Sequence, residues 1–132
     1  MRELVLKNCR LVRELVEGYE GEYADVFIRD GRIGAIRPLG YDFGQVPCLD
    51  ANKQTLLPGL IDLHMHLMFV NQDYPAMLQR SPYEYLLDCL DAAKLFLQQG
   101  YTTIRDCGCE KGANVAVRDA VNAGRVPGPR II

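Results

Sequence analysis

Short apolar segments alternate with polar positions through the first part of the chain, a pattern typical of β-strands. Four of these segments are predicted strands: residues 4–6, 11–12, 25–28 and 33–36. Asp30 and Gly31 stand between the last two segments, and this dipeptide is a strong signal for a hairpin turn. We therefore predict an antiparallel sheet in a first region, residues 1–55, with a loop at residues 40–47.

The pattern changes over residues 56–67, where a second region begins that extends to residue 132. One face of a strand here would carry the apolar side chains of Leu57, Ile61, Leu63, Met65 and Leu67. The opposite face would carry Leu60, Asp62, His64 and His66. This alternation predicts a strand whose apolar face packs under helices and whose other face ends in polar groups.

Helices and strands are expected to alternate after a loop at residues 71–80. Ser81, Pro82 and Glu84 supply an N-cap, a first-turn proline and a capping-box carboxylate for a helix that ends before Gly100. Its apolar residues recur at helical spacing: Tyr83, Leu86, Leu87, Leu90, Ala93 and Leu97. The later elements are a strand, a helix and the start of another strand, over residues 101–105, 114–123 and 130–132.

This order of elements is typical of parallel strands joined by helical crossovers, preceded by a separate group of strands. Two and a fraction βα units are too few to close a (β/α)8 barrel. A chain that stops inside an apolar strand also leaves a sheet edge without its partner. We therefore expect the 132 residues to form an incomplete part of a larger design.

The composition is that of an ordinary globular protein and excludes several classes of function. The chain is 48% hydrophobic and 24% charged, with a formal net charge of -2 and no basic stripe, so we expect no nucleic-acid partner. Its apolar stretches are too short for a membrane span, and no secretory signal is apparent. An odd number of cysteines, five, favours free thiols and a cytoplasmic location.

His64 and His66 are the only histidines in the sequence and the first candidates for chemistry. Side chains two apart on a strand point to the same face, so both imidazoles could hold one metal ion. A catalytic zinc usually takes three protein ligands plus water, and two imidazoles leave such a site unfinished. Taken alone, a His-x-His pair in a strand is more often structural or incidental than metal-binding.

The residues around this pair resemble the first barrel strand of metal-dependent amidohydrolases. In that superfamily a proline-glycine pair, here Pro58 and Gly59, leads into the pattern Asp-x-His-x-His, here residues 62–66. Other segments resemble the superfamily in the same order along the chain: residues 30–33, 49–51, 100–106, 118–120 and 124–130. The last two resemble the branch that is related to imidazolonepropionase and Xaa-Pro dipeptidases.

The resemblance implies an N-terminal β-sandwich portion, residues 1–55, followed by the first βα units of a (β/α)8 barrel, residues 56–132. It also implies that His64 and His66 are ligands of a divalent metal, zinc above all, with one or two ions in the complete site. Members of the superfamily use metal-activated water to hydrolyse C–N bonds in small, dipeptide-like or cyclic amide substrates. Their general-base aspartate and remaining ligands have no counterpart in these 132 residues.

Other polar residues near the histidines can be interpreted in two ways, as part of the metal site or as local structural groups. Asp62 is a candidate for orienting an imidazole by hydrogen bonding, or it caps nearby backbone or pairs with Arg105. Asp106 ends a predicted barrel strand, where functional groups gather, but a capping role is equally consistent. Cys107 and Cys109 could add sulfur ligands at the same strand end, which would make an unusual site.

Three hypotheses follow for the chain as a whole. The first is the N-terminal segment of an amidohydrolase, inactive when alone. The second is a subunit completed by a partner chain or by further copies of itself, which the unmade strand edges favour. The third is a non-catalytic remnant that serves as a binding or structural module.

Overall fold

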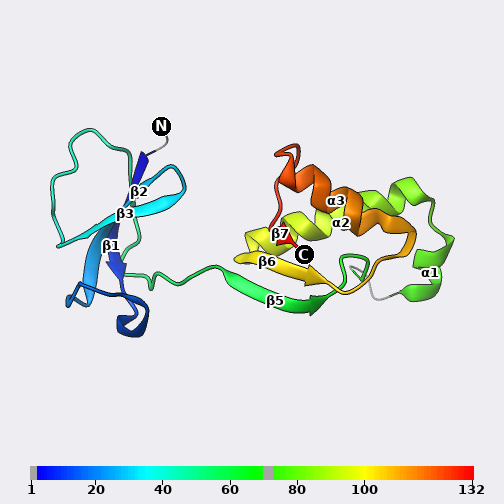
Figure 1. The fold of residues 1–132 in the computed structure, drawn as a ribbon, viewed down its shortest axis with the longest axis horizontal. Helices are drawn as coiled ribbons and strands as arrows, with labels where there is room; N and C mark the ends of the chain where they lie inside the picture. The colour runs from blue at the N-terminus through cyan, green and yellow to red at the C-terminus, as the bar shows by residue number, and fades with distance from the viewer. Residues whose placement is uncertain (1–2, 70–72) are drawn as a thin grey trace. The chain divides into compact units, whose positions relative to one another are not determined.

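The computed structural model describes residues 3–69 and 73–132. The chain divides into two compact units, Met1–Pro58 and Gly59–Ile132. The first unit is built from strands and one short 3-10 helix, whereas the second combines parallel strands with α-helices (Figure 1). Within the described residues, no helix has the length and apolar character needed to cross a membrane.

The first unit contains a four-stranded sheet in the order β3-β2-β1-β4. Its strands are β1 (Glu3–Arg10), β2 (Tyr23–Arg29), β3 (Arg32–Arg37) and β4 (Cys48–Asp50). The first three pair in antiparallel fashion, and the predicted hairpin turn joins β2 to β3 with positive φ angles at Asp30 and Gly31. The prediction of a wholly antiparallel sheet is wrong, because β4 pairs with β1 in parallel.

Strand β1 also differs from its predicted form. It continues through Asn8, where φ is 57° and the pairing register with β2 shifts. Residues 11–12 lie outside any strand and precede a 3-10 helix, Arg13–Leu15. The buried carboxylate of Asp25 accepts hydrogen bonds from the backbone N–H groups of Asn8 and Gly40, at 2.9 and 3.1 Å. This carboxylate therefore stabilises the irregular backbone at Asn8, because a buried backbone N–H without an acceptor would cost free energy.

The second unit confirms the predicted βαβ order. A parallel sheet runs β5-β6-β7, from strands β5 (Leu60–Met65), β6 (Tyr101–Asp106) and β7 (Arg130–Ile131). Helix α2 (Pro82–Gln98) connects β5 to β6, and α3 (Ala113–Asn122) connects β6 to β7 after a 3-10 helix, Glu110–Gly112. Helices α2 and α3 lie side by side over one face of the sheet (Figure 1). The chain therefore has the predicted class, N-terminal strands followed by βα units of the barrel type.

A short helix, α1 (Tyr74–Gln79), occupies part of the segment predicted as a loop, of which residues 71 and 72 lie outside the described residues. The side chain of Asp73 caps this helix by accepting from the Ala76 N–H at 3.1 Å, and Pro75 lies in its first turn. An N-cap aspartate followed by a first-turn proline favours the start of a helix, and here the helix forms although no long apolar pattern follows.

The predicted capping box of α2 is confirmed. Ser81 Oγ accepts from the Glu84 N–H at 3.3 Å, and Glu84 Oε2 accepts from the Ser81 N–H at 3.0 Å. The hydrogen bond from the Ser81 hydroxyl, together with the one from its backbone, holds the pKa of Glu84 below its usual value. Gly100 follows the helix with φ of 91°, a conformation that favours glycine.

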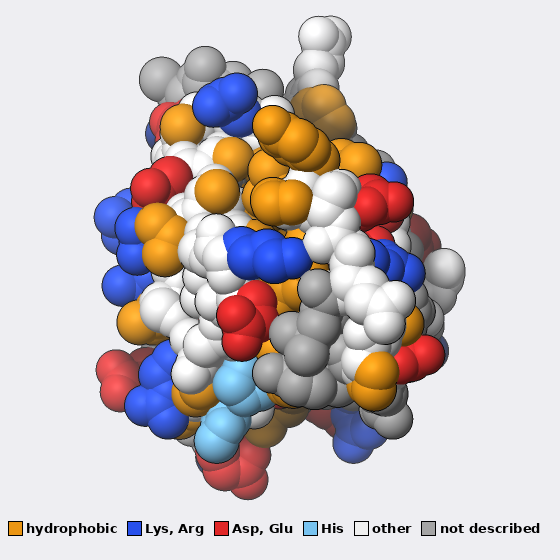
Figure 2. Space-filling view, turned by 90° about the vertical axis from the view of Figure 1, so that its right-hand side faces the viewer, with side chains coloured by type: hydrophobic (Ala, Val, Ile, Leu, Met, Phe, Trp, Pro, Cys, Tyr) orange, Lys and Arg blue, Asp and Glu red, His pale blue; other side chains and the backbone are white. Residues whose placement is uncertain are grey.

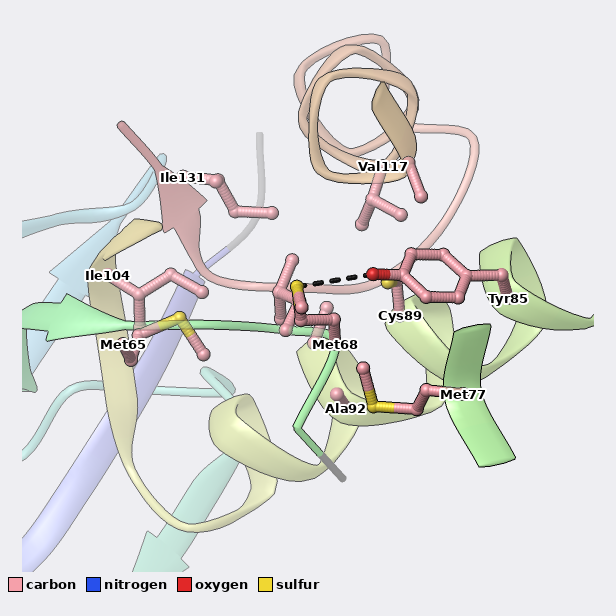
Figure 3. Close-up of a cluster of buried hydrophobic side chains, with 12 residues drawn as sticks. Met65, Met68, Met77, Tyr85, Cys89, Ala92, Ile104, Val117 and Ile131 are labelled. Carbon is pink, nitrogen blue, oxygen red and sulfur yellow. Dashed lines mark hydrogen bonds between the residues drawn. The ribbon is translucent and has the colours of Figure 1, made fainter. Parts of the chain in front are cut away.

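The buried face of α2 agrees only in part with the prediction: Ala93 is buried and Leu86 and Leu90 pack partly buried against the core, but other predicted residues are exposed. Tyr85, Cys89, Ala92 and Ala93 are buried, whereas Tyr83 is 81% exposed and Leu87 60% exposed. The buried residues are spaced as one helical stripe, and their small members let the helix approach the sheet closely. Cys89 and Ala92 lie with Met65, Met68, Ile104, Val117 and Ile131 in one core between helices and sheet (Figure 3).

Strand β5 packs beneath the helices only toward its C-terminal end. Met65 is buried there, as is Leu67 just beyond it, but Ile61 is 62% exposed and Leu63 60% exposed. The prediction that the whole apolar face is covered is therefore wrong for these two residues, and also for Leu57 before the strand, which is 57% exposed. The reason is that β5 is an edge strand, while α2 and α3 pack mainly over β6 and β7.

Candidate metal centre

The two histidines lie next to each other where strand β5 ends. His64 is in the strand and His66 is the first residue after it. Their ring centroids are 5.7 Å apart, with the ring planes inclined at 69°. His64 is exposed and His66 half-buried, and Figure 2 shows the pair of imidazoles together at the surface. The structure thus brings together the two side chains that the sequence singled out.

A backbone carbonyl fixes the orientation of the His66 ring. The Nδ1–H of His66 donates to the carbonyl oxygen of Gly108, with an Nδ1···O distance of 2.7 Å. Since a carbonyl can only accept, Nδ1 carries a proton, and in the neutral imidazole the lone pair therefore lies on Nε2. The rings of His66 and Phe69 also pack edge to face, with 5.1 Å between their centroids. A hydrogen bond of this kind is what orients a metal-binding imidazole in proteins.

Asp106 holds the segment that supplies this carbonyl. Its carboxylate accepts from the backbone N–H of Leu67 at 3.1 Å and from that of Gly108 at 2.9 Å. One side chain therefore joins the residues that follow β5 to those that follow β6. Asp106 acts on His66 indirectly, because it positions Gly108 rather than touching the imidazole.

Asp62 makes a local contact instead of reaching an imidazole. Its Oδ1 accepts from the backbone N–H of His64 at 2.9 Å. The Arg105 guanidinium donates through Nε to the Leu63 carbonyl oxygen at 2.5 Å. The arrangement matches the backbone-capping interpretation of Asp62, and it stiffens the backbone on which His64 is carried.

No third ligand completes the pair within the described residues. Across residues 3–69 and 73–132, no group of three or more His, Cys, Asp or Glu side chains could hold a metal ion. Cys107 is exposed, and Cys109 instead contacts Cys89, at 3.7 Å between sulfur atoms. Two imidazoles are suitable donors for zinc and similar ions, but they fill half of a tetrahedral site.

An apolar cavity of about 210 Å³ opens beside His66. Its lining comes from His66, Leu67, Phe69, Ala92, Leu95 and Phe96. His66 is the titratable group of this lining, so the cavity suits an apolar group held next to the imidazole.

Sequence reasoning did not identify the contribution of Gly108. A backbone carbonyl leaves no residue-type signature, and its position depends on the hydrogen bonds made by Asp106. The one available signal was an aspartate followed by a glycine two residues later, directly after a strand, where a turn that bends back on the carboxylate is favoured.

Three curated enzymes have sequences related to part of this chain. The chain is 32% identical to an L-hydantoinase of Paenarthrobacter aurescens over 68 residues, which are 52% of this chain and 14% of that protein. It is 38% identical to a dihydroorotase of Mycobacterium tuberculosis over 64 residues, 48% of this chain and 15% of that protein. An imidazolonepropionase of Pseudoalteromonas atlantica is 45% identical over 49 residues, 36% of this chain and 12% of that protein. No family model matches the chain.

Solved structures give the same result over nearly the whole chain. An amidohydrolase matches with a TM-score of 0.75 and 26% identity, covering 98% of this chain and 30% of its own. A prolidase bound to N-methylphosphonate-L-proline matches with a TM-score of 0.78 and 28% identity, covering 98% and 31%. The chain belongs to the amidohydrolase superfamily. It spans about a seventh of the length of the curated relatives and just under a third of these solved chains.

Proposed function

We propose that His64 and His66 bind one divalent metal ion, zinc in the first instance, as the first two ligands of an amidohydrolase site. The observation that carries this proposal is the hydrogen bond from His66 Nδ1 to Gly108, because it fixes the ring and makes Nε2 the nitrogen that is available to a metal ion in the neutral imidazole. The neighbouring imidazole of His64, at 5.7 Å between ring centroids, is close enough to share one ion.

The reaction served by this site is hydrolysis of a C–N bond in an amide, a peptide-like compound or a cyclic amide. The relatives named as L-hydantoinase and dihydroorotase and the neighbouring prolidase support this substrate class. A divalent metal supplies a Lewis acid that polarises a carbonyl and lowers the pKa of water toward neutrality. Among this chain's own residues, His66 presents Nε2, Asp106 holds the Gly108 carbonyl, and Asp62 stiffens the backbone at His64.

We also propose that the 132-residue chain by itself does not catalyse this hydrolysis. Two imidazoles leave a metal without a third protein ligand, and no candidate for it is assembled among the described residues. We propose that the remaining ligands and the general base come from polypeptide outside residues 1–132, continuous with it or in a partner chain. The exposed side chains of Ile61 and Leu63 support such a cover for strand β5, because large apolar residues on a sheet face are usually packed.

A turnover assay tests the inactivity. The purified chain and its His66→Ala variant are supplied with zinc and offered hydantoin, dihydroorotate or an Xaa-Pro dipeptide. We expect neither protein to raise the rate of hydrolysis above that in buffer with zinc alone. Turnover by the native chain that disappears both in His66→Ala and on addition of a chelator would contradict the inactivity while upholding metal binding.

A further inference from the structure

We propose that Cys89 and Cys109 form a reversible disulfide, which links helix α2 to the segment after β6. The two sulfur atoms are 3.7 Å apart although the residues are separated by twenty positions in sequence. A disulfide bond is about 2.05 Å long, so the sulfur atoms must approach each other by less than about 2 Å. Neither residue has a part in the metal centre proposed above.

The two cysteines differ in mobility and access in a way that suits this bond. Cys89 is completely buried in the middle of α2, whereas Cys109 is partly exposed in the segment between β6 and α3. Glycines at positive φ flank this segment, Gly108 at 147° and Gly112 at 69°. Because glycine tolerates wide changes in φ, the segment can adjust while Cys89 stays fixed.

Hydrogen bonds hold the Cys109 thiol against the helix. Its sulfur lies 3.8 Å from the hydroxyl of Tyr85, and that hydroxyl accepts from the Glu110 N–H at 3.1 Å. The same hydroxyl donates to Met68 Sδ at 3.1 Å, inside the core where Cys89 also lies (Figure 3). Tyr85 therefore holds the segment after β6 so that Cys109 faces Cys89.

The chemical environment divides the roles of the two thiols. The hydrogen bond with Cys89 lowers the pKa of Cys109 to about 7, while the same hydrogen bond and burial raise the pKa of Cys89. A thiolate that is accessible and close to neutral pKa is the usual attacking group in disulfide exchange. Cys109 is thus the entry point, and Cys89 is the buried thiol that completes the bond.

The oxidant required is a small disulfide such as glutathione disulfide. The Cys109 thiolate attacks one sulfur of the oxidant, forming a mixed disulfide and releasing one glutathione thiolate. Cys89 then loses its proton and its thiolate attacks the Cys109 sulfur, and the second glutathione leaves as a thiolate that takes up that proton. The chain loses two electrons and the oxidant gains them, forming two molecules of glutathione.

The disulfide would also constrain the metal centre, because Cys109 directly follows the glycine whose carbonyl accepts from His66. This consequence rests on the proposed function, whereas formation of the bond does not. Peptide mapping separates the two, since it reads the sulfur linkage without metal or activity.

The test treats the folded chain with glutathione disulfide, blocks free thiols, and digests it with trypsin without reduction. Cleavage after Arg80, Lys94, Arg105 and Lys111 puts Cys89 in residues 81–94 and Cys109 in residues 106–111. Mass spectrometry is expected to show these two peptides linked, and added dithiothreitol to separate them. Residues 106–111 also contain Cys107, so the Cys107→Ser variant is the matched control and should keep the link.

Loss of the link in Cys89→Ser and in Cys109→Ser, with retention in Cys107→Ser, supports the proposal. The exposed Cys48 reports whether the oxidant has reacted with the chain. Glutathione on Cys48 without any link between the two peptides would overturn the proposal, and so would a link that requires Cys107. The decisive readings come from the native chain and from Cys107→Ser, so they stand even if Cys89→Ser does not fold.

Discussion

Replacing Asp106 by alanine is expected to lower the free energy of unfolding of unit Gly59–Ile132 by about 3 kcal/mol. The Asp106 carboxylate accepts from two backbone N–H groups, those of Leu67 and Gly108, which are 41 positions apart in sequence. Removing it leaves both donors without their side-chain acceptor and deletes the side-chain link between the ends of β5 and β6. Urea unfolding followed by circular dichroism measures the loss.

Two further variants separate this role from a general effect of charge. Asp106→Asn keeps one side-chain oxygen as an acceptor, so we expect an intermediate loss. Asp119→Ala removes a carboxylate from an exposed ion pair with Arg118 and should change stability by no more than about 0.5 kcal/mol. Equal stability of Asp106→Ala and Asp119→Ala would contradict the linking role of Asp106.

Replacing Gly59 by alanine is expected to destabilise the same unit by about 2 kcal/mol or more, a typical cost of overpacking. A Cβ atom at position 59 would lie 2.2 Å from both Cγ2 and Oγ1 of Thr102 on the neighbouring strand, and 2.7 Å from Thr102 Cβ. These distances are far below van der Waals contact, so the strands β5 and β6 would have to separate. Thermal and urea unfolding both measure the effect.

A double-mutant cycle shows whether Thr102 is the cause. Thr102→Gly removes the obstructing side chain and is destabilising by itself, because glycine weakens a strand. Combined with Gly59→Ala, it should cost clearly less than the two single losses added together. Simple additivity would show that the cost of Gly59→Ala arises from something other than contact with Thr102.

The elements that sequence reasoning predicted well are those with strong local signals. The capping box at Ser81 and Glu84 and the hairpin turn at Asp30 and Gly31 depend on residues a few positions apart, so their physics is complete within a short window. The βαβ order followed from the alternation of helical and strand periodicity. The superfamily resemblance then supplied the barrel context for His64 and His66.

The features that sequence reasoning missed depend on contacts between distant segments. Close packing on the sheet decides which residues of α2 are fully buried, and it favours Cys89 and Ala92, which were not predicted, over the larger Leu87. The exposure of Ile61 depends on β5 lying at a sheet edge. The carbonyl of Gly108 reaches His66 across 42 residues, and periodicity carries no information about such a contact.

The central claim is that His64 and His66 together bind a divalent metal, and imidazole NMR during a zinc titration tests it most directly. The chain has two histidines, so a long-range ¹H–¹⁵N spectrum contains two imidazoles to follow. Before zinc is added, His66 should show the tautomer with its proton on Nδ1, as its hydrogen bond to Gly108 requires. We predict that both imidazoles respond at the same zinc concentration, with His66 binding through Nε2. No response of either ring at millimolar zinc, or a response of one ring alone, would contradict the account.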